Sequence, residues 1–148
     1  MNPTSPYEAA RMVANNCLCL RVQRASRAIA RHFDRAFRPL DLNNWQFSLL
    51  MHLCRPTPLT VSELAEKLAM DRTTTTANLK PLERRGLVAI HRDDKDARVK
   101  RVSLTDAGRA VLAEAIEHWR TANDAIVARL RDVDLGSLHS ALKTIAAT

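Results

Sequence analysis

The sequence predicts a mainly α-helical protein with one small β-hairpin. Only three of the 148 residues are glycine, which argues against a turn-rich β fold and favours helices joined by short connections. Apolar residues recur at helical spacing along most of the chain, and only residues 87–104 contain the short runs typical of paired strands. The length suits one domain with a real core, so residues 1–148 are expected to form a single domain.

The first segment is expected to be one long helix. Neither proline nor glycine occurs between Tyr7 and Ala36. Residues spaced by three or four form a stripe that becomes basic along its length: Val13, Cys17, Leu20, Arg24, Arg27, Arg31 and Arg35. The pattern predicts a helix with an arginine-rich face.

A second, shorter helix follows Pro39. Asn43 is a suitable cap for its first turn. The apolar residues beyond it lie almost all round the helix: Trp45, Phe47, Leu49, Leu50 and Leu53. A helix that is apolar on every side is expected at the centre of the core.

Two further helices are separated by only a few residues. Thr60 and Glu63 form the capping-box pattern at the start of the first. Its apolar face consists of Val61, Leu64, Ala65 and Leu68. Asp71 then begins the stretch DRTTTTANLKPLERRG. The spacing is that of a helix-turn-helix.

Four consecutive threonines within a helix need an explanation, because together they cost roughly 1 to 3 kcal/mol relative to alanine. A buried strand is the alternative, but the helical spacing of Thr75, Leu79 and Leu82 favours a helix with these three residues buried. The outward face is then polar and contains Thr73, Thr74, Thr76, Ala77, Lys80 and Arg84. Short hydroxyl side chains on such a face suit close approach to a DNA major groove.

The chain beyond Gly86 is expected to form a hairpin and two helices. Strands are predicted at residues 87–91 and 99–104, joined by a polar tip. Thr105 and Asp106 can cap a long helix that reaches about residue 131, and a last helix is expected at residues 134–146.

The charge distribution favours a polyanionic partner. The formal net charge is +7, and the surplus is concentrated in residues 1–40, with seven arginines against two acids, and residues 71–101, with nine basic residues against five acids. No apolar run of about 18 residues could span a membrane, so no membrane partner is expected. No signal-like N-terminus is present and the cysteine count is odd, so a cytoplasmic location is expected.

Residues 59–108, LTVSELAEKLAMDRTTTTANLKPLERRGLVAIHRDDKDARVKRVSLTDAG, resemble the winged helix-turn-helix core of the MarR family of bacterial transcription regulators. The resemblance is carried by L-A-x-x-L, the R-T-T start of the recognition helix, L-E-x-x-G-L-V, D-x-R and L-T-x-x-G. It implies a DNA-binding lobe at residues 43–108. It also implies a homodimer that pairs through the helices of residues 7–38 and 106–147, and a pseudo-palindromic double-stranded DNA operator.

The resemblance also implies which residues contact DNA. The recognition helix, which enters the major groove, contains Arg72, Thr73, Thr74, Thr76, Ala77 and Asn78. Arg98 matches the wing-tip arginine that enters the minor groove, and Asp96 matches the carboxylate that holds it. Lys80, Arg84 and Lys100 complete the predicted DNA-binding set. The neighbouring Asp93, Asp94 and Lys95 are expected to form a solvated turn.

Members of the family often respond to a small aromatic ligand in a cleft between the dimer helices and the DNA-binding lobe. The residues expected to contribute to such a cleft here are Arg24, Arg27, Trp45 and His52. An apolar cleft that contains a cation suits an aromatic acid or an acyl thioester. The sequence therefore predicts a repressor that such an effector releases from DNA.

Peroxide sensing is an alternative. The stretch CLCLRVQRASR resembles the segment that contains the reactive cysteine in the OhrR branch of the family, with Cys19 in that position. The tyrosines that this branch places near its cysteine are replaced by Phe33 and Asn44. The simpler expectation is that Cys17, Cys19 and Cys54 are small apolar residues on buried helix faces.

A metal site, a cofactor and an enzymatic activity are not expected. Cys17 and Cys19 lie on different sides of a helix, and so do His52 and Cys54, so neither pair is a natural chelate. A small cysteine or histidine enzyme is the alternative from another class. The sequence contains no glycine-rich phosphate loop, no nucleophile elbow and no carboxylate pair at ligand spacing.

Overall fold

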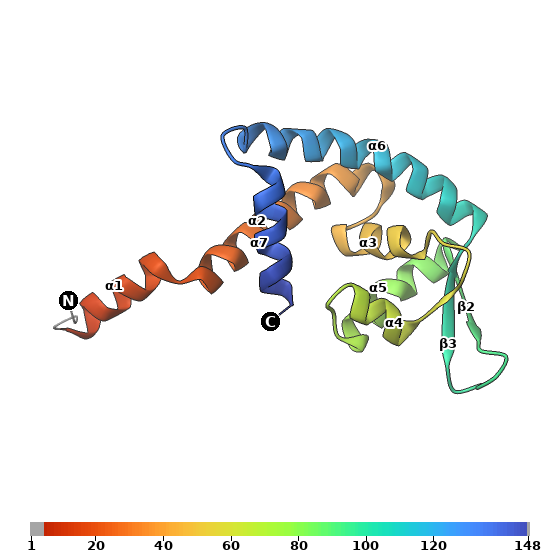
Figure 1. Ribbon diagram of the computed structural model, residues 1–148. Coiled ribbons are helices and arrows are strands. Elements are labelled where there is room, and N and C mark those ends of the chain that lie inside the picture. The colour runs from red at the N-terminus through yellow and green to blue at the C-terminus, as the bar shows by residue number, and fades with distance from the viewer. Residues whose placement is uncertain (1–4, 148) are drawn as a thin grey trace.

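The computed structural model describes residues 5–147 and confirms a mainly helical fold with a small antiparallel sheet. Figure 1 shows a compact lobe beneath two long helices, with a hairpin at one end. The elements are α1 (Pro6–Asn16), α2 (Leu18–Phe37), a short 3₁₀ helix (Arg38–Leu40), α3 (Asn44–Leu53), β1 (Leu59–Thr60), α4 (Val61–Lys67), α5 (Arg72–Arg84), β2 (Val88–Arg92), β3 (Lys100–Leu104), α6 (Asp106–Arg129) and α7 (Leu135–Ala146).

The sheet has the strand order β1-β3-β2, and all of its pairs are antiparallel. Val88 lies opposite Leu104, and Leu59 lies opposite Val102. The predicted hairpin is confirmed, although its first strand begins and ends one residue later than expected and its second begins one residue later. The third strand, β1, was not predicted, because two residues are too few to show an alternating pattern.

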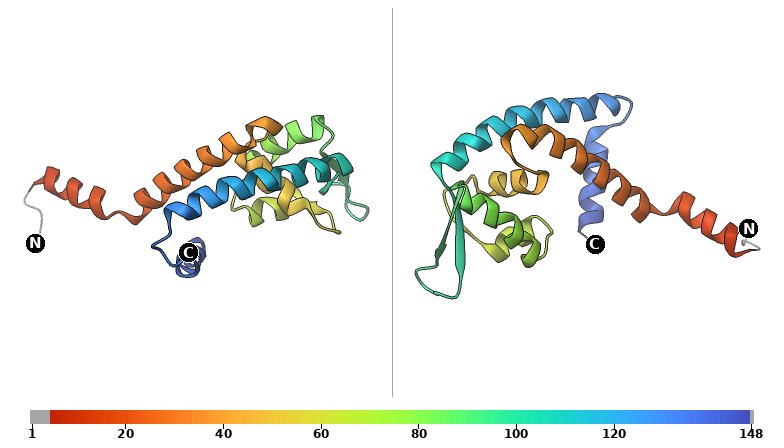
Figure 2. Two further views of the ribbon diagram at one scale, coloured as in Figure 1. Left: turned by 90° about the horizontal axis from the view of Figure 1, so that it is seen from above. Right: turned by 180° about the vertical axis from the view of Figure 1, so that it is seen from behind.

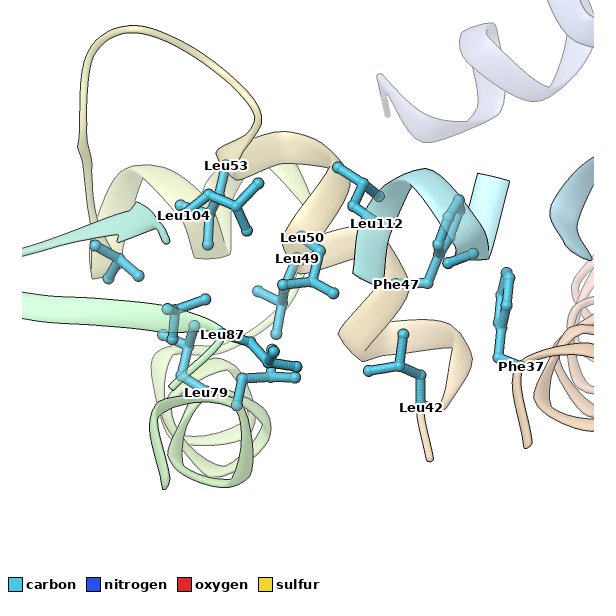
Figure 3. Packing of buried hydrophobic residues seen from close by; sticks show 14 of the residues in the cluster. Phe37, Leu42, Phe47, Leu49, Leu50, Leu53, Leu79, Leu87, Leu104 and Leu112 are labelled. Carbon is cyan, nitrogen blue, oxygen red and sulfur yellow. The ribbon is translucent and has the colours of Figure 1, made fainter. Parts of the chain in front are cut away.

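The core lies where α3 meets the other helices and the sheet. The Phe37 and Phe47 rings stack with their centroids 4.4 Å apart, which joins α2 to α3. Figure 3 shows the leucines of α3 among those of α5, the sheet and α6. The central position of α3 is confirmed, but the expectation for Trp45 was wrong: 44% of its surface is exposed. It lies on the side of α3 that no other element covers within residues 5–147.

The predicted single helix over residues 7–36 is wrong, because the chain breaks at Cys17. The backbone of Cys17 is extended (φ −67°, ψ 109°), and its sulfur accepts the first-turn N–H of Leu20 at 3.4 Å. The residues before it, Asn15 and Asn16, are weak helix formers, since a short amide side chain competes for backbone hydrogen bonds. Asn16 does this, donating to the carbonyl oxygen of Met12 at 2.8 Å.

The first turn of α6 lies directly against the start of the hairpin. The Thr105 backbone N–H donates to the Leu87 carbonyl at 3.1 Å, and the Thr105 hydroxyl donates to the Gly86 carbonyl at 2.6 Å. The same hydroxyl caps the helix by accepting the N–H of Gly108 at 3.0 Å. A Cβ on Gly108 would lie only 2.0 Å from the Leu87 oxygen, so only glycine permits this approach.

Helices α1 and α7 project from the rest of the chain (Figures 1 and 2). Neither contains a buried residue. Large apolar side chains are exposed on α1, at the start of α2, and on and just before α7: Tyr7, Met12, Val13, Leu18, Val133, Leu142 and Ile145. Within residues 5–147, no helix combines the length and the apolar character needed to cross a membrane.

Candidate DNA-binding interface

The four threonines at the start of α5 have different roles. Asp71 caps the helix, accepting both the backbone N–H of Thr74 at 2.8 Å and its hydroxyl at 2.7 Å. These two bonds lower the pKa of Asp71 below its usual value. Thr75 is fully buried, as predicted, and its hydroxyl donates to the Asp71 carbonyl at 2.9 Å. Thr74 and Thr75 therefore stabilise the helix start, which offsets their low helix propensity.

Thr73 and Thr76 have no intramolecular side-chain hydrogen bond in the described part of the chain, and both are exposed. Thr74, Ala77, Lys80 and Arg84 are exposed too, so the predicted outward face is confirmed. The hydroxyls of Thr73 and Thr76 are consequently available to an external partner.

A groove of about 770 Å³ separates α5 from the hairpin. Basic side chains line both walls: Arg72 and Lys80 from α5, and Arg92, Arg98 and Lys100 from the hairpin. The single acidic residue in its lining is Glu83. Five cations around one groove produce a positive field that attracts a polyanion.

The groove brings together many of the predicted DNA-binding residues and adds others. The predicted residues that line it are Arg72, Thr76, Lys80, Arg98 and Lys100. Those that do not line it are Thr73, Thr74, Ala77, Asn78 and Arg84. The additional polar residues are Thr60, Ser62, Glu83, His91 and Arg92.

Sequence reasoning could have found Arg92 from the hairpin register. Arg92 lies directly opposite Lys100, and like charges in such a pair destabilise a sheet. Binding of a polyanion to both side chains would offset this repulsion.

The hairpin tip is held by two separate ion pairs. The Nε of Arg98 is 3.1 Å from Oδ1 of Asp96, and its Nη2 is 3.1 Å from Oδ2, which confirms the predicted contact. The guanidinium lowers the pKa of Asp96. Because 92% of the Arg98 side chain is exposed, the pair orients Arg98 without burying it.

The expectation of a solvated turn was wrong for Asp93. Only 15% of its side chain is exposed, and it pairs with Arg101 of β3. It also accepts the backbone N–H groups of Lys95 and Asp96, each at 3.1 Å. The Arg101 guanidinium, with these backbone donors, lowers the pKa of Asp93 although burial opposes the shift. Asp93 thus shapes the turn that carries Arg98.

The amide of Asn78 is used inside the protein. Its Nδ2 donates to the Thr74 carbonyl at 3.0 Å, and its Oδ1 lies 3.4 Å from Nδ2 of Asn43. Asn78 is half-buried on the side of α5 that faces α3. These contacts place it beside the outward face rather than on it.

The predicted effector residues lie on α2, with Arg24 and Arg27, and on α3, with Trp45 and His52. Arg24, Arg27 and Trp45 are exposed, and half-buried His52 donates from Nδ1 to the Ser48 carbonyl at 2.9 Å. None of the four lines the α5 groove or the groove of about 550 Å³ between α2 and α6. The α2–α6 groove is lined by His32, Arg35, Ala36, Glu117, His118, Thr121, Ala122 and Ala125.

The expectation of buried cysteines was wrong for two of the three. Cys19 and Cys54 are exposed and Cys17 is half-buried. The Nε2 of Gln23 lies 3.3 Å from the Cys19 sulfur, in the geometry of a donated hydrogen bond. No cluster of three or more histidine, cysteine or acidic residues suited to a metal ion occurs within residues 5–147.

Comparison with known proteins identifies the fold family. The family model described as MarR family matches residues 40–99, which include α3, β1, α4, α5 and β2 and end just before β3. The crystal structure of the Mycobacterium tuberculosis transcriptional regulator MosR is 34% identical, with a TM-score of 0.77, and the match covers 89% of this chain and 94% of that one. The chain belongs to the MarR family. As a MarR-family protein, it is a transcriptional regulator.

Two further relatives are informative. The transcriptional repressor CouR, solved bound to a 23-mer DNA duplex, is 32% identical with a TM-score of 0.82, and the match covers 90% of this chain and 95% of CouR. The organic hydroperoxide resistance transcriptional regulator of Bacillus subtilis is 29% identical over 137 residues, which are 93% of this chain and 92% of the relative. The family resemblance predicted from residues 59–108 is therefore confirmed for nearly the whole chain.

Proposed function

We propose that this MarR-family chain is a homodimeric repressor that binds a pseudo-palindromic DNA operator through residues 43–108. The observation that carries the proposal is the groove between α5 and the hairpin, which is lined by five basic side chains and by the hydroxyl groups of Thr60, Ser62 and Thr76. The existence of relatives solved with DNA, CouR and MosR, supports the same partner.

In this proposal α5 enters the major groove with its N-terminal turns foremost. Arg72, Thr73 and Thr76 contact base edges, and Ala77 permits close approach. Thr74 contributes its methyl group, since its hydroxyl is bound to Asp71. Arg98 enters the adjacent minor groove, and the other basic residues, Lys80, Arg84 and Lys100, neutralise phosphates.

The dimer forms through residues 7–38 and 106–147. Helices that bury no residue of their own and expose large apolar side chains need a partner, and a second copy supplies it. Two copies related by a twofold axis present two α5 helices to half-sites about one DNA turn apart, roughly 34 to 36 Å. Sedimentation should therefore give a dimer at micromolar concentration.

Release from DNA follows from a population shift. The dimer can adopt arrangements in which its two DNA-binding lobes are separated by different distances. A small aromatic or acyl-type effector that binds one of the other arrangements reduces the fraction of dimers whose two α5 helices match the spacing of the operator half-sites. An effector of this kind should lower operator affinity without unfolding the protein.

A second mechanism of release is supported by Cys19. Its sulfur is exposed and a relative is named for organic hydroperoxide resistance. In this mechanism the thiolate attacks the terminal peroxide oxygen, the O–O bond breaks, an S–O bond forms, and the alkoxide leaves as alcohol after taking a proton. Hydroperoxide should then abolish DNA binding by the native protein but not by Cys19→Ser. Release of both proteins to the same extent rules this mechanism out.

The test of DNA binding starts with a randomised pool of duplexes, from which the native protein should enrich an inverted repeat. Thr76→Ala should relax preference at one or two base positions by about 1 to 3 kcal/mol per half-site. Arg98→Gln should weaken binding and reduce the salt dependence by about one unit per hairpin. Arg120→Gln, which removes an equal charge from α6, is the control. With its dimer verified by sedimentation, this variant should change neither the operator affinity nor its salt dependence. Failure to enrich any inverted repeat contradicts the proposal.

A further inference from the structure

Arg85, at the C-terminal end of α5, connects the recognition helix to the end of α2. Its Nη1 donates to the Asp41 carbonyl at 2.6 Å, and its Nη2 donates to the Leu40 carbonyl at 2.9 Å. The two acceptors precede Arg85 by 44 and 45 residues, so the fold alone brings these groups together. Arg85 is therefore not merely a surface cation at the end of its helix.

The two carbonyls form a suitable site for a guanidinium. The short 3₁₀ helix Arg38–Leu40 continues α2, and Asp41 ends it in the left-handed conformation with φ 52°. The Asp41 N–H donates back to the Arg38 carbonyl at 3.0 Å. The carbonyls of Leu40 and Asp41 are thus left at a helix C-terminus, where partial negative charge accumulates and favours a cation with two donors.

A second polar contact lies beside the first. Asn43, two positions after Asp41, donates to the side-chain oxygen of Asn78 at 3.4 Å. The next residue, Asn44, donates its backbone N–H to Asp34 of α2 at 2.7 Å. Residues 40–44 therefore contact α5 on one side and α2 on the other.

An open cavity of about 420 Å³ lies at this junction. Its lining is largely polar and includes Asp34, Arg38, Asp41, Gln46, Pro81 and Arg85. The hydrogen bonds of Arg85 join α5 directly to the segment that ends α2, in addition to the packing of both helices on α3. They give a displacement of α2 a second route to α5.

We infer that Arg85 is a positioning residue that sets the angle of α5 relative to α2, and through it the separation of the two recognition helices in the dimer. The inference rests on the proposed function, because the separation matters only when two copies bind one operator. Arg85 acts through the backbone of residues 40 and 41, not through a contact with DNA.

The experiment uses the full-length protein and the inverted-repeat duplex that the native protein enriches. Two derivatives of that duplex have one base pair inserted or removed at the centre. Affinities of native protein, Arg85→Ala, Arg85→Lys and Arg84→Ala are measured for all three duplexes over a range of salt concentrations. Arg85→Lys keeps the charge but has one nitrogen donor group in place of the fork.

For Arg85→Ala we expect affinity for the native spacing to fall about five- to tenfold, while affinity for the altered spacings changes less than twofold. The salt dependence stays as in the native protein, and Arg85→Lys shows the same loss of preference. Arg84→Ala, at a proposed phosphate contact, instead reduces the salt dependence and keeps the spacing preference.

Unchanged spacing preference in Arg85→Ala and Arg85→Lys overturns the inference, and so does a reduced salt dependence in Arg85→Ala. If Arg85→Ala does not fold, Arg85→Lys decides by the same criteria. Absence of an enriched inverted repeat for the native protein is a different result, because it contradicts the proposed function itself.

Discussion

Replacing Gly108 by alanine tests how closely α6 and the hairpin are packed. The added Cβ would lie 2.0 Å from the Leu87 carbonyl oxygen and 2.8 Å from a methyl group of Leu104. The Leu87 oxygen is part of a backbone and already accepts the Thr105 N–H at 3.1 Å, so it must withdraw by about 1 Å and weaken that bond.

The expected loss of stability follows from three contributions. Overpacking costs about 1 to 3 kcal/mol. Weakening the Thr105 hydrogen bond costs about 1 kcal/mol. The higher helix propensity of alanine offsets about 1 kcal/mol of this loss. The free energy of unfolding should therefore fall by about 1 to 3 kcal/mol, which lowers the melting temperature of a chain of this size by roughly 3 to 10 °C.

Gly136→Ala is the matched control, since Gly136 is also in the first turn of a helix. Its added Cβ would have only an ordinary contact, 3.6 Å from an Asp134 carboxylate oxygen. This variant should be as stable as the native protein or up to about 1 kcal/mol more stable. Calorimetry of all three proteins at one protomer concentration provides the measurement. Equal melting temperatures for Gly108→Ala and the native protein would refute the close packing of α6 on Leu87.

Three further predictions concern α5 and the hairpin. Leu82 is fully buried, so Leu82→Ala should lower the free energy of unfolding in urea by about 2 to 5 kcal/mol, and a loss below 1 kcal/mol contradicts its place in the core. Thr75→Val removes a buried donor and should cost about 0.5 to 1.5 kcal/mol, whereas Thr76→Val, at an exposed position, should change stability by less than about 0.5 kcal/mol. Because the pKa of Asp93 is lowered from 3.8, its stabilising ion pair is complete above that pH and is lost as the pH falls through the lower, folded value. An NMR titration should place the Asp93 midpoint below 3.8 and show that Arg101→Gln raises it; equal midpoints in the two proteins contradict this assignment.

The parts of the fold that were predictable from sequence are those with a strong local signal. The caps at Asn43, Thr60, Asp71 and Thr105 all begin helices as predicted, because each has a side-chain oxygen placed for a first-turn N–H. The buried face of α5, formed by Thr75, Leu79 and Leu82, was predicted from helical spacing and is confirmed. The break at Cys17 was missed because the apolar and basic stripe continues across it without a proline or glycine.

The site was predictable where it depends on motifs and not where it depends on tertiary contacts. Spacing and resemblance located the outward threonines and the Asp96–Arg98 pair. They could not show that Asp93 pairs with Arg101 across the hairpin, or that Arg85 reaches residues 40 and 41. Both contacts join residues from different parts of the fold, and periodicity in a sequence indicates only which residues share a face of one helix or strand.

Hydrogen exchange measured by mass spectrometry, with and without the enriched duplex, tests the central claim most directly. The α5 groove is proposed to be covered by DNA, so amides of residues 71–80 and 92–100 should exchange more slowly in the complex, at a protein concentration where the dimer is fully formed in both samples. Unchanged exchange in those two segments, together with slower exchange along the arginines of residues 21–38, would contradict the account, because the duplex would then lie on α2.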